Sequence, residues 1–326
     1  MPDMSELHKF LFDGLPVRGS IVRLTDAWQE VLARRAGNSQ MGAYPACVRR
    51  LLGEMLAAGA LMQSNIKFNG ALVLQIMGDG PVKVAVVEVQ SDLSLRATAS
   101  IQGDVPADAS LSQMVNVTNT GRCAITLDPQ DKLPGQQPYQ GVVPLYGDHN
   151  EKLESLGSVL QHYMLQSEQL DTMLVLAADD TVAAGLLIQR LPVHGDKNLA
   201  ATGQVNEDEI GRNEAYNRIA ILASSVQPEE LLTLDVQTIL HRLFWEEKVL
   251  QFAPQVPKFT CSCSKERVQS MLRSLGADEV ESVLAEQGQV EVGCDFCGTQ
   301  YRFDPVDAAQ IFTQFPVQMP QQGTLQ

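Results

Sequence analysis

Four of the six cysteines in this 326-residue chain lie close together near its C-terminus. Cys261 and Cys263 form a C-x-C pair, and Cys294 and Cys297 form a C-x-x-C pair thirty residues further on. Residues i and i+2 of an extended chain point to the same side, and a C-x-x-C in a tight turn sets two sulfurs along one edge of a tetrahedron. Gly298 suits such a turn. The spacing therefore predicts one zinc ion held by four thiolates.

The same four sulfurs could also act as a redox switch. Zinc keeps its cysteine ligands as thiolates, which are the nucleophilic form of the side chain. A disulfide between Cys261 and Cys263 would close a very small ring, and strained disulfides are the labile ones. Oxidation would expel the metal, which supplies much of the folding free energy of a small zinc domain. Residue chemistry alone leaves two interpretations open: a static zinc site and an oxidation-sensitive one.

Two other functional classes compete with these interpretations. A thiol–disulfide oxidoreductase would use Cys294 and Cys297, but that chemistry places C-x-x-C at the start of a helix, and here Gly298 and a predicted strand follow. A constitutive zinc-ribbon module would bind RNA or a protein partner. Residues 259–312 hold four basic and nine acidic side chains, a net charge of −5 that disfavours nucleic acid.

The whole chain is acidic as well, with a formal net charge of −15, so we expect neither nucleic acid nor anionic lipid as a partner. No secretory signal pattern begins the sequence, and no apolar run reaches the roughly 18 residues that span a bilayer. We therefore expect a cytoplasmic protein without membrane contact. Phosphate-loop, G-x-S-x-G and H-E-x-x-H motifs are missing from the sequence, and we do not expect an enzyme.

The elements before the cysteine pairs predict an α+β core domain over residues 1–192, built on antiparallel sheets with helices. Helical patterns begin at Thr25, at Pro45 and near residue 153, and residues 70–90 read as a hairpin with a turn at G-D-G. Strand patterns follow within residues 95–105, 123–129, 139–148, 172–179 and 181–192. Cys123 alternates with apolar neighbours and is interpreted as a core residue, whereas Cys47 lies near a helix start.

Residues 193–258 predict a metastable linker of amphipathic helices. Helical amphipathicity extends from Asn213 to Phe252, with a break at Pro228. The apolar anchors, which we also regard as candidate client-binding residues, are Ile219, Leu222, Leu231, Leu234, Ile239, Leu240, Leu243 and Phe244. Such short helices are not stable alone and need a surface to pack against.

Residues 259–312 predict a small zinc-binding domain, and residues 313–326 a disordered tail. Ser264 can cap a first helix, and Asp278 with Glu281 has capping-box spacing for a second one. The inward-facing residues of the first helix are expected to be Val268, Met271, Leu272 and Leu275. Strands on both sides of the C-x-x-C then form a hairpin, and a last helix follows.

The pattern Cys261–Ser264 with Arg267, followed by "VLAEQGQVEVGCDFCGTQYRF", closely resembles the redox-regulated holdase chaperones known as the thirty-three-kilodalton heat-shock proteins. Similar segments in that family correspond to "LFDGLPVRGSIV", "MGDGPV", "YQGVV", "SEQL", "EELLTL" and "HRLFWEE", so the resemblance covers nearly the whole chain. The chain departs from the family pattern at Asp128–Pro138 and His194–Gly211, away from the cysteines.

This resemblance implies a cytoplasmic stress-response chaperone that acts without ATP. The reduced form would bind one zinc ion through Cys261, Cys263, Cys294 and Cys297 and be inactive. Peroxide or hypochlorous acid under unfolding conditions would form Cys261–Cys263 and Cys294–Cys297 disulfides and release zinc. The zinc domain and linker would then unfold and hold unfolded or oxidatively damaged client proteins. Reduction would pass clients to ATP-driven foldase chaperones for refolding, and oxidation would favour homodimers.

Overall fold

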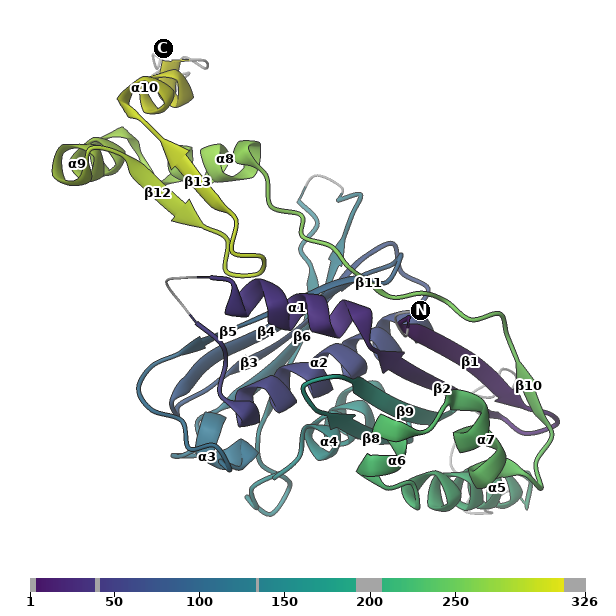
Figure 1. Cartoon of the computed structure of the whole chain (residues 1–326). Coiled ribbons are helices and arrows are strands. Elements are labelled where there is room, and N and C mark those ends of the chain that lie inside the picture. The colour runs from purple at the N-terminus through teal and green to yellow at the C-terminus, as the bar shows by residue number, and fades with distance from the viewer. Residues whose placement is uncertain (1–3, 39–41, 133–134, 192–206, 314–326) are drawn as a thin grey trace, which may run out of the picture. The chain divides into compact units, whose positions relative to one another are not determined.

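A computed structural model describes residues 4–38, 42–132, 135–191 and 207–313 (Figure 1). The chain divides into two compact units, Met1–Thr260 and Cys261–Gln326. The predicted tail beyond residue 313 and the start of the predicted linker, up to residue 206, lie outside the described residues. Among the residues that are described, no helix is long and apolar enough to cross a membrane.

The larger unit contains a five-stranded antiparallel sheet in the order β10-β1-β2-β9-β8. Its strands are β1 (Glu6–Phe12), β2 (Val17–Leu24), β8 (Thr172–Ala178), β9 (Ala183–Arg190) and β10 (Val249–Gln251). The side chains of β2 alternate between the two faces, so Val22 and Leu24 join one hydrophobic cluster while Val17 and Ile21 join another. Both faces of this sheet are therefore covered.

A second sheet has six strands in the order β11-β5-β4-β3-β6-β7. They are β3 (Gly70–Met77), β4 (Val82–Gln90), β5 (Ser94–Ile101), β6 (Arg122–Pro129), β7 (Tyr139–Pro144) and β11 (Lys258–Phe259). Neighbours are antiparallel except β11, which runs parallel to β5. The hairpin predicted over residues 70–90 is confirmed, as is the α+β class with antiparallel sheets.

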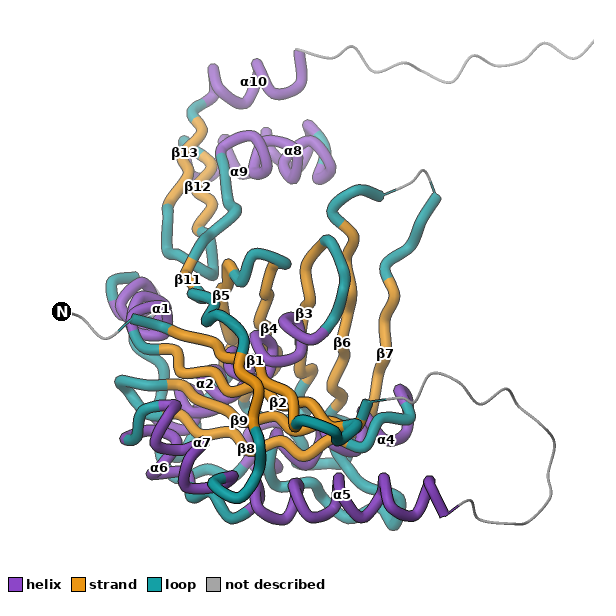
Figure 2. The backbone as a smooth tube through the Cα atoms, turned by 90° about the vertical axis from the view of Figure 1, so that its right-hand side faces the viewer, coloured by secondary structure: helices purple, strands orange, loops and turns teal. Residues whose placement is uncertain are grey.

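The helix α2 (Ala46–Asn65) forms the centre of the larger unit and contacts strands of both sheets (Figure 2). It is apolar around nearly its whole circumference, as expected of a helix buried on all sides. Gly59 allows close approach to β4, because a Cβ there would lie 3.1 Å from Val89 and 3.3 Å from Val87. The helices α1 (Asp26–Ala36), α3 (Leu111–Val115) and α4 (Leu156–Glu168) complete this part of the fold.

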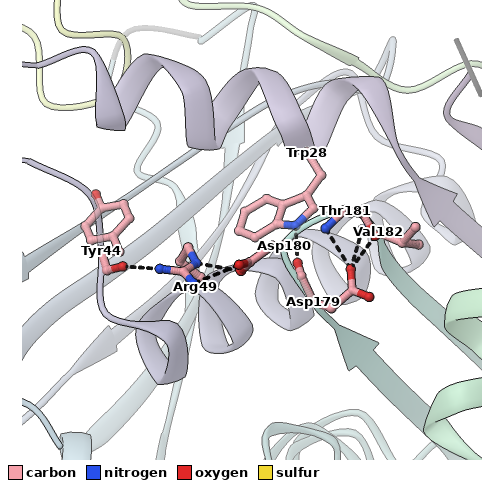
Figure 3. A network of polar contacts seen from close by, with 7 residues as sticks. All are labelled: Trp28, Tyr44, Arg49, Asp179, Asp180, Thr181 and Val182. Carbon is pink, nitrogen blue, oxygen red and sulfur yellow. Dashed lines mark hydrogen bonds and ion pairs between the residues drawn. The ribbon is translucent and has the colours of Figure 1, made fainter. Parts of the chain in front are cut away.

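A polar cluster fixes the turn between β8 and β9 to α1 and α2 (Figure 3). The buried Trp28 donates its indole N–H to the carbonyl oxygen of Asp179 at 2.8 Å. Asp179 closes the turn by accepting the backbone N–H of Thr181 at 2.7 Å. Arg49 binds both carboxylate oxygens of Asp180, at 2.6 and 2.9 Å. These contacts satisfy the polar groups where helices and hairpin meet.

The helices α5 (Glu207–Ser224), α6 (Pro228–Thr233) and α7 (Val236–Phe244) cover the face of the first sheet that is turned away from α2. Of the eight predicted apolar anchors, Ile219, Leu231, Ile239, Leu240, Leu243 and Phe244 are buried in this second cluster, and Leu222 and Leu234 are partly buried against it. Arg23 on β2 donates to the carbonyl oxygen of Leu232 at 2.7 Å, which helps hold the end of α6 to the sheet.

The smaller unit consists of α8 (Lys265–Leu275), α9 (Ala277–Gln287), β12 (Val290–Gly293), β13 (Gln300–Phe303) and α10 (Pro305–Thr313). The Ser264 hydroxyl caps α8 by accepting the backbone N–H of Arg267 at 3.3 Å, as predicted. The hairpin β12–β13 and the last helix are confirmed as well. A small core joins these elements and includes Leu272, Val280 and Phe303.

Several local predictions were wrong. Met271 and Leu275 are 42% and 56% exposed instead of inward-facing, because this small unit has too few elements to cover the whole apolar side of α8. The capping box at Asp278 does not form, since Gly276 precedes α9 directly and no side chain caps it. The helix predicted to reach Phe252 ends at Phe244, and the residues beyond it enter a strand.

The sequence analysis also missed β1 and β2, and it predicted no strand within residues 253–259. In the structure, this segment continues in extended conformation from β10 to β11. Leu7 and Gln255 exchange backbone hydrogen bonds of 2.9 Å in both directions midway along it. The segment therefore pairs with edge strands of both sheets, which no local residue pattern indicates.

Candidate metal centre

The four cysteines of the smaller unit are positioned by a helix cap and a hairpin turn. Cys261 and Cys263 lie in the extended residues before α8, whose N-terminus Ser264 caps. Cys294 and Cys297 lie in the turn between β12 and β13, closed by a hydrogen bond of 2.8 Å from Gly298 N to Cys294 O. Gly298 has φ of 73°, which a residue with a Cβ rarely adopts.

The four sulfur atoms all lie within 4.8 Å of one another. The Sγ atoms of Cys261 and Cys294 are 3.6 Å apart, and those of Cys263 and Cys297 are 3.3 Å apart. A tetrahedral zinc ion with bonds of about 2.3 Å needs sulfurs about 3.8 Å apart. The donor set and its spacing therefore fit a zinc ion, and the structure brings together all four cysteines predicted from the spacing.

Hydrogen bonds surround this cluster and could orient its sulfurs. The Tyr301 hydroxyl donates to Cys263 Sγ at 3.2 Å, and the Thr299 hydroxyl lies 3.2 Å from Cys297 Sγ. Both residues follow the C-x-x-C directly, on or just before β13. The sequence analysis missed them. Two signals could have indicated that these hydroxyls bond the sulfurs. Thr299 lies two residues after Cys297, and Tyr301 lies two residues later, on the same face of the strand.

The environment changes the pKa values of these groups unequally. Burial is the largest influence on the Cys294 and Cys263 thiols and raises the pKa of both. Burial acts in the same direction on Cys297, but hydrogen bonds from the side chain and backbone of Thr299 outweigh it and lower the Cys297 pKa to about 7. The hydrogen bond to Cys263 raises the pKa of Tyr301. Cys297 is thus partly thiolate at neutral pH.

The remaining two cysteines lie in the larger unit and away from each other in the fold. Cys123 on β6 is fully buried, and burial raises the pKa of its thiol to about 12, which agrees with the predicted core role. Cys47, in the first turn of α2, is buried too and donates its thiol to the carbonyl oxygen of Pro106 at 3.1 Å. Neither has the exposure that a reactive thiol needs.

The C-x-x-C geometry also bears on the oxidoreductase alternative. The C-x-x-C pair is followed by Gly298 and the strand β13, so no helix begins at this pair, as it would in a thiol–disulfide oxidoreductase. The arrangement is that of a zinc knuckle with two facing cysteine pairs. Site and fold together define a two-sheet α+β protein that carries a tetracysteine metal site in a separate small unit.

Comparisons with known proteins agree with this class. A family model described as Hsp33 protein matches residues 5–304. The 33 kDa chaperonin of Chromobacterium violaceum is 46% identical over 310 residues, covering 94% of this chain and 93% of the relative. That of Methylobacillus flagellatus is 45% identical over 308 residues, with 94% coverage of both. The chain belongs to the Hsp33 family, as the sequence motifs predicted, and its function is that of a chaperone.

A solved structure has the same fold. The crystal structure of the 33 kDa chaperonin, an Hsp33 homologue, from Thermotoga maritima aligns with a TM-score of 0.71. The alignment covers 94% of this chain and 97% of that chain, at 22% sequence identity. At this identity the likeness supports the fold alone. As a chaperone, the protein is expected to bind unfolded client proteins.

Proposed function

We propose that this protein is a redox-regulated, ATP-independent holdase. In the reduced state, Cys261, Cys263, Cys294 and Cys297 hold one zinc ion and the protein is inactive. On oxidation, two disulfides form, zinc leaves, and the protein binds unfolding proteins. The observation that carries this proposal is the convergence of all four sulfurs within 4.8 Å in a protein of a chaperone family.

The oxidation step balances with peroxide as the oxidant. Two thiolates give two electrons to one hydrogen peroxide molecule, a sulfur–sulfur bond forms, and two hydroxide ions result. Two such reactions consume all four zinc ligands. Because every sulfur is near every other, proximity does not select one pairing. The Cys261–Cys263 and Cys294–Cys297 pairing follows from the family resemblance, and the zinc-bound thiolates are the nucleophiles that the oxidant attacks.

Loss of zinc should unfold the smaller unit, because its core is small and metal ligation contributes folding free energy. We propose that the preceding linker, residues 193–258, then loses its packing as well. The packed face of α5–α7 includes Ile219, Leu240 and Phe244, buried in the second cluster. Separation of these helices would expose that face and the sheet beneath it, and exposed apolar surface is what holds unfolded proteins.

The remaining parts of the proposal concern partners. Clients are unfolded or oxidatively damaged proteins, which the oxidised form holds without using ATP. Reduction and zinc rebinding would return them to ATP-driven foldase chaperones for refolding. The oxidised form is proposed to favour a homodimer. The place of action is proposed to be the cytoplasm, where reducing systems can reset the thiols.

The test follows three quantities in one sample: zinc release to a chromogenic chelator, free thiols, and light scattering of a heat-unfolded reporter enzyme. Peroxide at mildly raised temperature should release about one zinc per chain as four thiols disappear. Suppression of scattering should appear at the same rate and reverse with reductant and zinc.

Two single-cysteine variants sharpen this test. Cys263→Ser removes one zinc ligand and one disulfide, so it should no longer switch between an inactive and an active state. Cys47→Ser is the matched control, because it removes a thiol but keeps a donor for the Pro106 carbonyl. If scattering is suppressed equally before and after oxidation of the wild-type protein, or if zinc stays bound, the cluster is a static structural site.

A further inference from the structure

The residues after α7 form an extended segment that covers the outer edges of both sheets. We call residues 248–260 the strap. Its strand β10 lies beside β1, and its strand β11 lies beside β5 (Figure 1). Phe252 N donates to Lys9 O at 2.9 Å, and Thr260 N donates to Leu95 O at 3.1 Å. Without the strap, β1 and β5 would each be an edge strand.

Backbone hydrogen bonds contribute more to holding the strap than buried side chains do. Leu250, Phe252 and Val256 are 43%, 53% and 52% exposed. Pro257 is buried, and the partly buried Val249 and Phe259 pack against the second and the first cluster, respectively. A backbone hydrogen bond contributes only about 1 kcal/mol net, and segments with few buried apolar contacts open first. The strap is therefore held mainly by backbone pairing and by few buried side chains.

The chemistry of the strap is that of an unfolded protein segment. Residues 249–257, "VLQFAPQVP", carry no charge, whereas 19% of the whole chain is charged. They are extended, largely apolar and exposed. A native surface segment is normally polar, and an exposed apolar strand on a sheet edge is a site where proteins associate. The strap thus pairs with one strand at the edge of each sheet, and its sequence resembles the apolar segments of unfolded proteins that a chaperone binds.

We propose that β1 and β5, once the strap leaves them, bind extended apolar segments of unfolding proteins as an added strand. This inference rests on the proposed function, in which oxidation frees the strap, and it specifies how clients are recognised. Hydrogen bonds between backbones depend little on side-chain identity, so this mode of binding can accept clients of diverse sequence. Under this inference the proposed homodimer of the oxidised form uses another surface, and a second copy at these edges is an outcome that the test below distinguishes.

Hydrogen exchange of the full chain tests this proposal directly. The amide of Leu7 donates to Gln255 O in the structure, so it should be protected in the reduced form. After oxidation it should exchange fast, and addition of chemically denatured luciferase should slow its exchange again by about tenfold or more. Peptides covering β5 should behave in the same way. Client held in a soluble complex while Leu7 stays unprotected would overturn the proposal.

A pair of strap variants separates this proposal from the redox switch. Phe252→Pro removes the N–H that donates to Lys9 O, and Phe252→Ala keeps that N–H while shortening the half-exposed side chain. In the reduced, zinc-bound state, Phe252→Pro should bind client about tenfold more tightly than Phe252→Ala. Client protection of Leu7 in Phe252→Pro, with no activation of wild type by peroxide, would uphold the edge proposal and reject the redox one.

Two further outcomes would count against client addition to the edges. Equal client binding by Phe252→Pro and Phe252→Ala would show that the freed edges do not recognise clients. Protection of Leu7 in oxidised protein without client, together with a doubled mass in light scattering, would show that a second copy occupies the edge. Either result overturns the proposal, whatever the behaviour of the cysteines.

Discussion

The two units of this chain are stabilised by different means. The unit Met1–Thr260 buries two large hydrophobic clusters, which contain aromatic side chains such as Trp28 and Phe10. The described part of Cys261–Gln326 buries a core of six residues, one of them an alanine. A core in so short a segment rarely supplies more than about 3–5 kcal/mol. The comparison indicates that burial stabilises the larger unit, and it predicts that metal ligation by the four cysteines stabilises the smaller one.

The largest expected effect unfolds the smaller unit and releases the linker, while the two sheets of the larger unit stay folded. Cys294→Ser should remove zinc binding and leave α8–α10 unfolded, because structural zinc contributes on the order of 10 kcal/mol in small domains. Limited proteolysis with mass spectrometry should show cleavage within α5–α7 and after Thr260, while the strands β1–β9 stay protected. Ser262→Ala, which changes a residue between two cysteines but no thiol, is the control. A protease-resistant smaller unit in Cys294→Ser would mean that its core suffices.

The next effect concerns burial in the larger unit. Phe244 packs edge-to-face on Phe12, with ring centroids 5.0 Å apart, in the cluster beneath α7. Phe244→Ala should cost about 3–5 kcal/mol of stability in the reduced protein, while Phe244→Leu should cost much less. Urea unfolding measures both. Phe244→Ala should also retain more client before oxidation, and a cost under about 1 kcal/mol would show that this cluster contributes little.

A smaller effect depends on pH and again concerns the larger unit. Burial is the largest influence on Glu54 in α2 and raises its pKa to about 7, although Arg50 opposes it. The folded carboxyl is therefore protonated more readily than the unfolded one, whose pKa is near 4.5. Stability attributable to this group is fully present below pH 4.5 and is lost as the pH rises through 7.

The substitution Glu54→Gln should remove this loss of stability at high pH, because the glutamine side chain does not ionise. The variant should be more stable than wild type by about 1–3 kcal/mol at pH 8 and nearly equal to it at pH 5. Thermal unfolding of the reduced protein at both pH values measures the difference. The same stabilisation at pH 5 and pH 8 would show that ionisation of Glu54 is not its cause.

The smallest effect concerns the polar cluster at the β8–β9 turn. Arg49→Lys keeps a positive charge but loses the two parallel bonds to Asp180. Because Asp180 is largely exposed, the cost should be only about 0.5–1 kcal/mol. Chemical denaturation should detect it. A cost above about 2 kcal/mol would mean that polar contacts stabilise the larger unit more than the comparison of cores implies.

Local patterns were sufficient for the features that a few neighbouring residues determine. The C-x-C and C-x-x-C spacing identified Cys261, Cys263, Cys294 and Cys297 because a tetrahedral ion constrains the spacing of its ligands along the chain. The hairpin over residues 70–90 followed from alternation and the turn at Gly78–Gly80. Pro228 marked the start of α6 because proline is favoured in a first helical turn.

The features that were missed depend on distant parts of the chain. The strap contains Pro254 and Pro257, which normally argue against a strand, and its pairing depends on Leu7 and Leu93, far away in sequence. Exposure of Met271 and Leu275 was missed because an apolar helix stripe does not reveal how many elements are available to cover it. Tyr301 and Thr299 acquire their role only when the hairpin brings them to the sulfurs.

The two-faced packing of the first sheet has a consequence for the speed of recovery. Val22 and Leu24 of β2 remain packed beneath α2 when α5–α7 leave the opposite face. We therefore expect the antiparallel ladder of β1, β2, β9 and β8 to persist through the proposed cycle of activation. Return to the resting state then requires docking of the helices and pairing of the strap with strands that are already in place. It avoids assembly of the four-stranded ladder itself from residues far apart in sequence, which is a slow step of folding.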